Sequence, residues 1–496
     1  MESAIVPQAK ELSVLVVGAG IAGLCAAIAL RRAGHRVKIL ERSALLDEIG
    51  AAITLAPHAV RIFRSWGLDG AREAAARLIP RLGQTFIDSA TLAELAPTDR
   101  TNFAAEYGAP YLFAHRVDLH AALRALATGP DGAGRPAELR TSCTAVDYDA
   151  ETGRVRVAET TTEDGWEPAV DLVVAADGVH SRAASHVLPG GHEANPPAVA
   201  PRATNSTVIR FLIPTREILA DPLTAPLLQR YGEGHCSFYL HADRQRWLVR
   251  YPCRANTLQN FGMYVERAPA PGESAQRSQQ QRVSPADLRA AMAGFHPALL
   301  RLCDMAGGSG GGSSSSSNTI LPLWRCAERD PLPNCQRGKL VVIGDASHPM
   351  LPHRGFGAVN AIEDAAALGV LFEDFAVGDH TAANTTATAT ATASTGHSQR
   401  DTKSAPPAPL SVSDLLETFQ KVRLPRASIA QLYSQVETNK DPTIERREEA
   451  LKLLPEDELP KNTDEVVRWV FSYDVVEATR RAKQRLLETK GVSLQQ

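Results

Sequence analysis

The first informative stretch of this chain is Ser13-Val-Leu-Val-Val-Gly18-Ala-Gly20-Ile-Ala-Gly23, in which a short apolar run meets three closely spaced glycines. The run Ser13–Val17 predicts a buried strand, and the helix-forming residues Ala22–Ala33 predict a helix that ends at Gly34. Val37–Leu40 repeats the pattern of a buried strand. The N-terminal sequence therefore predicts a strand, a helix and a second strand in close succession.

These glycines and a downstream carboxylate predict that the unit binds a dinucleotide. Gly18 permits the tight turn, Gly20 lets the backbone approach a pyrophosphate, and Gly23 allows the helix to pack closely on the strand. The free N–H groups at the helix N-terminus attract phosphates. Glu41 ends the second strand, where its carboxylate would accept hydrogen bonds from a ribose diol and disfavour a 2′-phosphate. The bound nucleotide is therefore expected to be FAD or NAD and not NADP.

Two further motifs place an acidic residue and a glycine after a buried strand. The first is Asp177-Gly178, at the end of an apolar run. The second is Gly344-Asp345, which follows the strand pattern Leu340–Ile343 and precedes the predicted helix Ala358–Leu371. The loop before that helix contains Pro352, Gly355 and Gly357. A helix N-terminus in this position suits a second electron-rich group, and Asp345 is a candidate for binding a ribityl hydroxyl.

Composition and charge exclude several classes of protein. The chain has 496 residues, of which 44% are hydrophobic and 22% are charged, and its formal net charge is −3. These values indicate a soluble globular protein of two or three domains and give no sign of nucleic-acid binding. The sequence shows no membrane span and no N-terminal signal pattern. The seven cysteines contain no C-x-x-C pair, which favours reduced, buried thiols in a cytoplasmic protein over disulfides or a metal site.

Changes in composition along the chain separate a sheet, two low-complexity segments and a helical end. Asn205–Val265 alternates apolar and polar residues, which predicts an antiparallel sheet in a second domain. Gly307–Ser317 and Thr381–Pro409 bury too little to offset the cost of ordering their backbone and are expected to be flexible surface insertions. Ser413–Val436 and Thr463–Leu487 predict amphipathic helices. Three aromatic residues near the end are expected to pack onto the body of the protein and not on a membrane or a partner: Trp469, Phe471 and Tyr473.

The glycine fingerprint with Glu41-Arg42, Asp177-Gly178 and Gly344-Asp345 together resemble the three signatures of single-component (group A) flavoprotein aromatic hydroxylases, in particular the salicylate hydroxylase-like, fungal branch. The resemblance covers nearly the whole chain apart from the two insertions. Further matches to this family are Gly50-Ala51-Ala52-Ile53, Arg116, Arg210, Tyr251-Pro252 and Ile362-Glu-Asp-Ala365. One position departs from the family, because Phe356 stands where a glutamine is usual. This puts in doubt any polar contact of that amide with the flavin or the substrate.

The resemblance implies that FAD is held permanently at the N-terminal unit. Residues implied in its binding are Gly18, Gly20, Gly23, Glu41, Arg42, Gly50, Ala51, Ala52, Arg116, Asp177, Gly178, Gly344, Asp345, Pro352, Gly355, Gly357 and Ala358. NAD(P)H would reduce the flavin as a transient co-substrate, because the sequence has no second strand-borne glycine fingerprint. O₂ would then form a flavin C4a-hydroperoxide, whose distal oxygen is attacked by an electron-rich aromatic carbon.

The implied fold is α/β, with a Rossmann-type FAD-binding domain, an inserted antiparallel-sheet substrate domain and C-terminal helices, as in para-hydroxybenzoate hydroxylase. The FAD-binding domain is expected in three parts, at residues 1–85, 112–200 and 336–375. The substrate domain is expected at residues 86–111 and 201–335. A low-complexity linker at 376–411 and a helical region at 412–496 are expected to follow.

In phenol-dearomatising members of this family, an arginine and a tyrosine of the substrate sheet bind and activate the phenolate. Arg210 matches the arginine, and Tyr239 is the candidate for the tyrosine. A guanidinium near a phenol lowers the phenol pKa and favours the nucleophilic anion. The competing hypotheses are a structural arginine at the domain joint and an aromatic core residue. Two nearby histidines, His115 and His348, are expected to hold the backbone more than to transfer protons.

The sequence thus predicts an FAD-dependent monooxygenase that uses NAD(P)H and O₂ to hydroxylate or dearomatise a phenolic substrate, in secondary metabolism or aromatic catabolism. Two alternatives are open at this point. Epoxidation of a terpenoid or meroterpenoid alkene would keep the fold and change the chemistry. A flavin-binding regulator without turnover would bind a partner through its C-terminal helices. No metal site is predicted, and a homodimer is compatible with the sequence.

Overall fold

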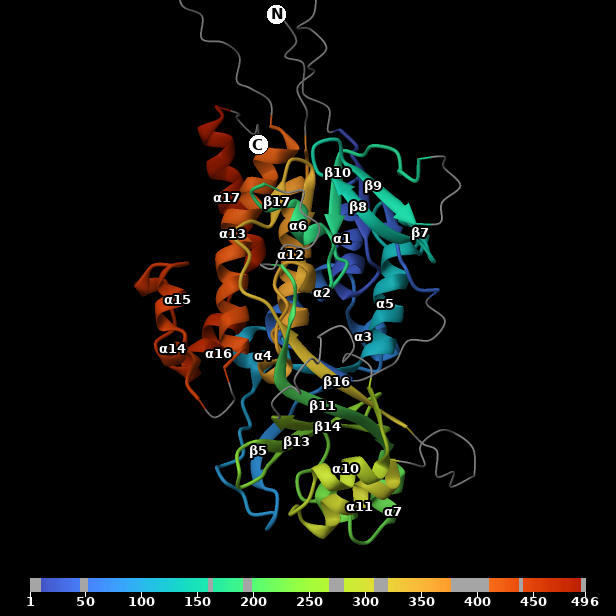
Figure 1. Ribbon diagram of the computed structural model, residues 1–496, viewed down its shortest axis with the longest axis vertical. Coiled ribbons are helices and arrows are strands. Elements are labelled where there is room, and N and C mark those ends of the chain that lie inside the picture. Colours follow the sequence, from blue (N-terminus) through green and yellow to red (C-terminus); the bar gives the residue numbers. More distant parts are fainter. Residues whose placement is uncertain are drawn as a thin grey trace, which may run out of the picture.

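The computed structural model describes residues 10–44, 52–158, 164–190, 199–266, 281–306, 320–375, 410–436 and 440–491. Gly50, Ala51 and the segments Gly307–Ser317 and Thr381–Pro409 lie outside these ranges, so what the sequence predicts for them stays a prediction. The described chain forms an α/β part above a separate sheet, with the C-terminal helices along one flank (Figure 1). The predicted α/β class is confirmed.

The α/β part is built on a sheet whose described strands follow the order β17-β18-β10-β1-β2-β7. All neighbouring pairs in it are parallel except β17–β18. The strands are β1 Ser13–Val17, β2 Arg36–Leu40, β7 Glu138–Arg140, β10 Leu172–Ala175, β17 Gln336–Arg337 and β18 Leu340–Val342. The buried strands predicted near Ser13, Val37 and Leu340 are therefore confirmed.

Two buried helices bring distant parts of this domain together. Helix α1 spans Ile21–Arg32 and helix α12 spans Gly357–Phe372, both close to their predicted bounds. Helix α1 is rich in alanine and buried along most of its length, so a neighbouring helix approaches closely. A Cβ on Gly369 of α12 would lie 3.0 Å from the Cβ of Ala29. Small side chains therefore bring α12, and the loop that precedes it, against the N-terminal unit.

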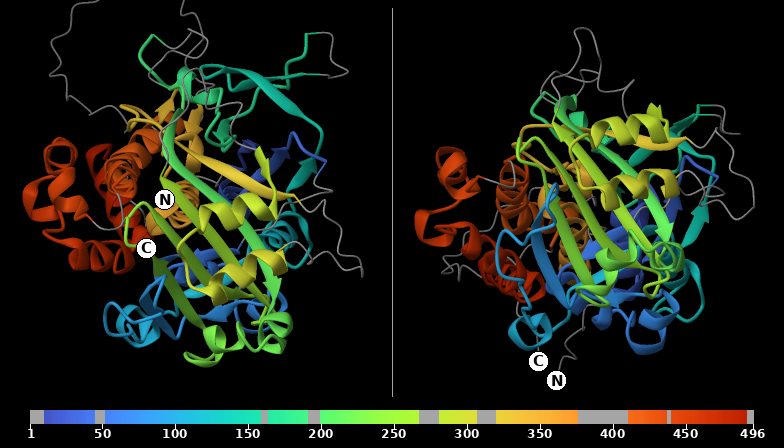
Figure 2. Two further views of the ribbon diagram at one scale, coloured as in Figure 1. Left: turned by 60° about the horizontal axis from the view of Figure 1, so that its bottom comes forward. Right: turned by 90° about the horizontal axis from the view of Figure 1, so that it is seen from below.

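The second domain is a sheet whose described strands follow the order β15-β16-β11-β14-β13-β12-β5, antiparallel except for the pair β12–β5. Its strands are β5 Gly83–Asp88, β11 Arg202–Pro214, β12 His235–Leu240, β13 Arg246–Cys253, β14 Leu258–Glu266, β15 Gln281–Val283 and β16 Leu321–Glu328. The antiparallel sheet predicted within Asn205–Val265 is confirmed. Helices lie across one face of it, as Figure 2 shows, and the other face looks toward the α/β part. The covering helices are α7 Thr215–Ala220, α8 Ala225–Gln229, α10 Pro285–Ala291 and α11 Pro297–Ala306.

A small sheet forms the seam between the two domains. It consists of β3 Ala52–Leu55, β6 Leu112–His115 and β4 Ile79–Pro80. Ile79 and Phe113 of this sheet share a buried cluster with Val249 and Tyr264 of the large sheet. The described elements that belong neither to the sheets above nor to the C-terminal region are helices, one hairpin and two 3-10 turns. They are α2 Pro57–Ser65, α3 Gly70–Ala75, α4 Phe103–Tyr107, α5 Arg116–Thr128, α6 Ala183–His186, the hairpin β8 Thr144–Asp149 and β9 Arg154–Ala158, and the 3-10 turns η1 Gly344–Ala346 and η2 Pro352–Arg354.

The C-terminal region is helical, but one predicted helix is interrupted. Its elements are α13 Val412–Ser434, α14 Pro442–Glu445, α15 Arg447–Leu451, η4 Glu456–Glu458, α16 Thr463–Phe471 and α17 Val475–Thr489. The single helix predicted at Thr463–Leu487 is therefore wrong. It breaks because Asp474 caps α17, its side chain accepting a hydrogen bond from the N–H of Glu477. A capping residue has non-helical backbone angles, so a new helix begins there.

The aromatic residues of this region pack onto the body of the protein, as predicted. The guanidinium of Arg426 lies 3.9 Å from the ring centroid of Trp469 and 3.7 Å from that of Tyr473. The ring of Phe471 stacks on His58 of α2. The C-terminal helices are thus attached through buried rings and one buried cation.

The cysteines agree with the predicted reduced thiols. All seven lie in the described ranges, and each is buried and free of disulfide bonds. In the part of the chain that the structure describes, no helix combines the length and the apolar character needed to cross a membrane.

Arg31 clamps the end of one helix to the segment after another. It lies at the C-terminal end of α1 and is fully buried. Its guanidinium donates hydrogen bonds of 2.6–3.0 Å to the carbonyl oxygens of Leu126, Ala127, Gly129, Gly132 and Gly134. Carbonyl groups at a helix end lack partners within the helix. The two terminal nitrogens of the guanidinium are therefore satisfied, and the end of α5 is held in place.

Replacing Arg31 by glutamine is expected to lower the free energy of unfolding by about 3 kcal/mol, because several buried carbonyls lose their donor. The matched control is Arg32→Gln, since Arg32 is exposed and donates to a single carbonyl, that of Ser65. The control is expected within about 0.5 kcal/mol of the parent. Urea unfolding of both variants measures the difference, and equal stability of the two would contradict the clamp.

Candidate functional site

The predicted motifs meet at one edge of the α/β sheet. Strands β18, β10, β1 and β2 are parallel neighbours, so their carboxyl ends lie side by side. Gly344-Asp345 follows β18, and Asp177-Gly178 follows β10. The glycine turn follows β1, and Glu41 follows β2. Such sheets bind ligands in the crevice outside the carboxyl ends of their strands, so the motifs form one candidate site.

The turn Gly18–Gly23 has the shape that close contact with a phosphate requires. Gly18 has a φ of +100°, and a Cβ on it would lie 2.3 Å from the carbonyl oxygen of Ala176. A Cβ on Gly23 would lie 1.8 Å from the carbonyl oxygen of Gly18, so this glycine lets the helix approach the turn. Gly20 differs, because a Cβ on it would meet no atom within 4 Å. It faces open space at the N-cap of α1, where the free N–H groups point.

Glu41 lies beside this turn, where the sequence predicts a ribose-binding carboxylate. Its Oε2 accepts a hydrogen bond from the N–H of Ala19 at 2.7 Å, and its Oε1 accepts one from the N–H of Ser43 at 2.8 Å. The ring of His120 contacts the carbonyl oxygen of Ala19 at 2.7 Å. The turn is therefore held from two sides, with the exposed Arg42 next to it.

Asp177 fixes the second motif with one oxygen and leaves the other unsatisfied among the described residues. Its Oδ2 accepts hydrogen bonds from the Tyr148 hydroxyl at 3.1 Å and from the N–H of Arg182 at 3.0 Å. Its Oδ1 is buried and has no hydrogen-bond partner within the described ranges. A buried carboxylate oxygen without a donor is costly, so a ligand or water group is expected beside it. The neighbouring Gly178 has a φ of +82° and borders open space.

Asp345 reaches solvent but has much protein around its carboxylate. Its side chain is exposed, yet desolvation by the surrounding protein raises its pKa. The carboxylate is therefore accessible to a ligand although protein atoms partly exclude water from it. His348, Arg116 and Arg329 oppose the rise in its pKa, so all three lie within electrostatic reach. The predicted residues Arg116, which begins α5, and Asp345 are thus brought together by the fold.

Arg329 supports the Asp345 loop from inside the protein. It is buried and donates hydrogen bonds to the carbonyl oxygens of Ala346 at 2.7 Å and Ser347 at 2.9 Å. Burial lowers the pKa of Arg329 to about 10, and Asp177 and Asp345 oppose that change. One guanidinium therefore acts on both acidic motifs. The sequence does not single out Arg329, because its neighbours Glu328 and Asp330 are also charged, which is the pattern of an exposed segment.

Two contacts fix the α/β part onto the open face of the large sheet. On one side, the hydroxyl of Tyr251 donates to the carbonyl oxygen of Ala52 at 2.9 Å, and the N–H of Ala52 donates to Oδ1 of Asn260 at 3.2 Å. On the other side, His353 of η2 contacts the hydroxyl of Ser206 at 3.2 Å and packs edge-on against two aromatic rings of the sheet. Strand β3 and the loop before α12 are therefore seated on the sheet at separate places.

Arg210 lies between these two contacts. Arg210 on β11 pairs with Gly262 on β14. On β14, Gly262 lies midway between Asn260, which belongs to the contact with Ala52, and Tyr264, which belongs to the contact with His353. A Cβ on Gly262 would lie 3.2 Å from the Tyr264 ring, so the glycine lets that ring lean toward Arg210. Burial raises the pKa of Tyr264 and of Tyr251. The half-buried Arg210 opposes both rises, and it forms a hydrogen bond with Tyr264. One arginine and two tyrosines thus share this part of the sheet face.

The structure places Tyr239 on the opposite face of the large sheet. It is 2% exposed and packs with Leu248 in the core that the helices cover. The predicted pairing of Tyr239 with Arg210 is therefore contradicted, and its competing hypothesis, an aromatic core residue, is confirmed. The tyrosines beside Arg210 are Tyr251 and Tyr264. Finding them requires the register between strands, because successive residues of a strand point to opposite faces.

His348, His115 and Phe356 have structural surroundings. Nε2 of His348 lies 2.6 Å from Oδ2 of Asp364, and the ring is buried. His115 is buried at the N-cap of α5, 3.8 Å from Asp118. Both contacts are with carboxylate side chains, so the prediction that these histidines hold the backbone stays a prediction. Phe356 belongs to the main core, so the departure from the family replaces a polar group by a core contact.

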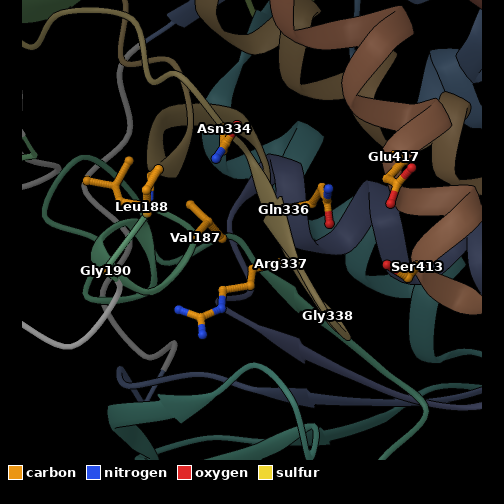
Figure 3. A pocket seen from close by; sticks show the side chains of 10 residues that line it. Val187, Leu188, Gly190, Asn334, Gln336, Arg337, Gly338, Ser413 and Glu417 are labelled. Carbon is orange, nitrogen blue, oxygen red and sulfur yellow. The ribbon is translucent and has the colours of Figure 1, made fainter.

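A further cavity is lined by other residues (Figure 3). Its volume is about 420 Å³. The lining residues come from the end of α6, from the segment around β17 and from the first turns of α13: Val187, Leu188, Pro189, Gly190, Asn334, Gln336, Arg337, Gly338, Ser413 and Glu417. This set contains no residue predicted for cofactor or substrate binding, so the cavity is separate from the candidate site.

Comparison with known proteins shows the family of the chain. A family described as an FAD binding domain matches residues 11–195. The FAD-dependent monooxygenase phomE' of Diaporthe leptostromiformis is 33% identical over 458 residues, which cover 91% of this chain and 98% of that protein. The 6-hydroxynicotinate 3-monooxygenase of Bordetella bronchiseptica is 30% identical, over 75% of this chain and 85% of that protein. A salicylate hydroxylase substrate complex has a TM-score of 0.64 at 20% identity, over 95% of this chain and 98% of that chain.

The fold and the crevice define a flavoprotein oxidoreductase built like para-hydroxybenzoate hydroxylase. The chain belongs to the FAD-dependent monooxygenases and is of the group A aromatic hydroxylase type. The family that the sequence resembles and the predicted enzyme class are thereby confirmed.

The residues of the crevice fit FAD. The open space before Gly20 and the N–H groups of α1 would hold the pyrophosphate, and Glu41 would bind the ribose. Asp345 and Arg116 would face the part of the cofactor beyond it. The remaining predicted residues of this region lie at η2 and the first turn of α12: Pro352, Gly355, Gly357 and Ala358.

Two glycine substitutions separate cofactor binding from folding. Gly20→Ala is expected to leave the FAD-free protein within about 0.5 kcal/mol of the parent, because its Cβ meets no atom. It is expected to weaken FAD binding by on the order of tenfold or more, because the methyl group fills the space for the phosphate. Gly23→Ala is expected to prevent folding, since its Cβ would overlap a carbonyl oxygen. Flavin fluorescence titration and urea unfolding test both, and unchanged FAD affinity in Gly20→Ala would place the pyrophosphate elsewhere.

Buried histidines predict a loss of stability in acid. Burial lowers the pKa of His58, His235 and His353 to about 4, whereas an exposed histidine titrates near pH 6.5. Below pH 6.5 the unfolded chain binds protons that the folded protein excludes, so stability falls until about pH 4. The expected loss between pH 7 and 4 is up to about 3 kcal/mol for each histidine. Urea midpoints at several pH values measure it, with His235→Gln expected to flatten the curve, and a midpoint that does not change down to pH 5 would refute it.

Proposed function

We propose that this enzyme uses NAD(P)H and O₂ to hydroxylate a phenolic ring bound against Arg210. The observation that carries the proposal is the place of Arg210, between the two contacts that seat the FAD-binding domain on the sheet. Its side chain is half-buried, so a ligand can touch a guanidinium that water only partly screens. A cation in such surroundings selects an anionic or easily ionised ring substituent.

Arg210 would favour the phenolate form of the substrate. A guanidinium stabilises the anion and lowers the phenol pKa, and the phenolate carries more electron density on its ring carbons. Tyr264 hydrogen bonds the same guanidinium, and its hydroxyl is a second donor for the substrate oxygen. Tyr251, tied to Ala52, shapes the opposite side of the site. These residues replace Tyr239 as the partners of Arg210.

Bound FAD supplies the electrons and the activation of O₂ that hydroxylation needs. The role of the protein is to orient the aromatic ring of the substrate and to exclude water. Paired rings stand on both sides of Arg210, with Trp247 and Tyr264 stacked at 4.9 Å and Phe113 and Tyr251 stacked at 5.0 Å. These apolar walls suit a planar aromatic substrate. The name of the relative 6-hydroxynicotinate 3-monooxygenase, which describes a hydroxylated ring, supports the same substrate class.

The proposal includes transient binding of NAD(P)H and a cytoplasmic location. The sequence has one glycine fingerprint, which FAD would occupy, so the reductant has no dinucleotide fold of its own. Seven buried, unpaired cysteines favour a reducing compartment, where NAD(P)H is also available.

Substitutions on the sheet face test the proposal. Arg210→Gln is expected to lower kcat/KM for the phenol by about 10²-fold, because the charge beside the phenolate is lost, and Tyr264→Phe by about tenfold, because a hydrogen bond to it is lost. Tyr239→Phe is the matched control and is expected to leave kcat/KM within about twofold of the parent, since Tyr239 faces the helix-covered core. NAD(P)H consumption and hydrogen peroxide release, measured across a panel of phenols, separate turnover from uncoupling.

The products decide the chemistry. A gain of one oxygen on the ring supports hydroxylation, and loss of aromatic absorption with the same mass gain supports dearomatisation. A product with an intact phenol and an oxidised side-chain alkene would show epoxidation instead. Failure of every phenol to accelerate NAD(P)H oxidation by the FAD-loaded enzyme would overturn the proposal.

A further inference from the structure

A buried network of charged side chains joins the C-terminal helices to the FAD-binding domain. Arg423 of α13 lies at its centre, with a side chain that is 1% exposed. Its Nε donates to Oδ1 of Asp364 at 2.9 Å, and its Nη1 donates to Oε2 of Glu363 at 2.5 Å. Both carboxylates belong to α12 and are as deeply buried as the guanidinium. One arginine therefore bridges two neighbouring acids across a helix–helix interface.

Asp364 extends this contact to the cofactor loop. Its Oδ2 accepts a hydrogen bond from the N–H of Gly344 at 3.0 Å and lies 2.6 Å from Nε2 of His348. Each carboxylate oxygen has two lone pairs, so these contacts and the bond to Arg423 are compatible. Gly344 and His348 stand on either side of Asp345 in the sequence. A single carboxylate thus holds both ends of the turn that presents Asp345 to the crevice.

Electrostatics make this arrangement depend on Arg423. Burial alone would raise the pKa of Asp364, but His348 and Arg423 hold it below its ordinary value. Burial alone would lower the pKa of Arg423, but Glu363 and Asp364 hold it above its ordinary value. Arg426 is a weaker partner, 3.8 Å from Glu363, and burial lowers its pKa to about 10. Without Arg423, two adjacent buried carboxylates would lose their bonded cation, which proteins tolerate poorly.

We propose that Arg423 is a positioning residue for FAD. It acts through Asp364 on the turn Gly344–His348, so the C-terminal helical region completes the cofactor site although no residue of α13 need touch the cofactor. The proposal rests on FAD binding at the crevice and is independent of the aromatic substrate.

Titration of FAD into the full-length apoprotein tests this role. Arg423→Gln and Asp364→Asn are each expected to raise the Kd for FAD on the order of tenfold. The double variant is expected to bind FAD no more weakly than Asp364→Asn, because Arg423 acts only through that carboxylate. The control is Lys490→Gln, which breaks the 2.8 Å ion pair of Lys490 with Asp414 between the end of α17 and α13, remote from the loop. This control is expected to keep the Kd of the parent.

Two readouts distinguish positioning from a loss of stability. In the FAD-saturated protein, Arg423→Gln is expected to shift the flavin absorption spectrum and reduction potential, whereas Lys490→Gln is expected to change neither. Where Arg423→Gln does not fold, Arg423→Lys keeps the charge but not the two-pronged contact and is measured in its place. The proposal is overturned if a folded variant at Arg423 binds FAD with the Kd of the parent. It is also overturned if the effects of Arg423→Gln and Asp364→Asn on the Kd add up in the double variant. Neither readout uses phenol turnover, so an error in the substrate assignment would not affect the outcome.

Discussion

The carboxylate of Asp364 on α12 is bonded to a C-terminal helix and to both ends of the turn after β18. It contacts Arg423 on α13, the N–H of Gly344 after β18 and the ring of His348. A carboxylate at this depth is stable only with such partners, so helix, turn and C-terminal region must close on it together. The same loop presents Asp345 to the crevice and continues to His353, which is seated on the large sheet. Cofactor site and substrate face therefore depend on one buried anion.

The substrate side depends on a different constraint, the register of the large sheet. Arg210, Gly262, Tyr264 and Tyr251 come from three strands and meet because β14 pairs with both β11 and β13. A slip of one residue would turn the guanidinium into the helix-covered core. The hydrogen bonds of Ala52 to Tyr251 and Asn260 then decide where the FAD-binding domain sits above this face. The arrangement of side chains at the interface thus follows from strand pairing within the large sheet and from the docking of the FAD-binding domain onto it.

Much of the FAD-binding domain could be predicted because its signals are local. The turn at Gly18–Gly23, the strand before it and Glu41 lie within a short stretch of sequence. The steric requirements of the backbone explain the role of each glycine in the turn. The interrupted helix at Thr463–Leu487 was missed because apolar periodicity hides a cap, although Asp474 stands three residues before Glu477 in the pattern of a helix start. The prediction of Tyr239 rests on loose spacing along the sequence, which carries no information about the face of a sheet on which a side chain lies.

The sequence alone determined the dinucleotide fingerprint, the two acidic motifs, the antiparallel sheet and the family, because each can be recognised from neighbouring residues or from a periodic pattern. Only the tertiary structure decided which tyrosines accompany Arg210, that Arg329 lies between Asp177 and Asp345, and that Arg423 reaches Asp364 from a helix far along the chain. The physical reason is that a buried charge is defined by partners brought to it by folding. Its own neighbours in the sequence do not show whether it will meet water or another ion.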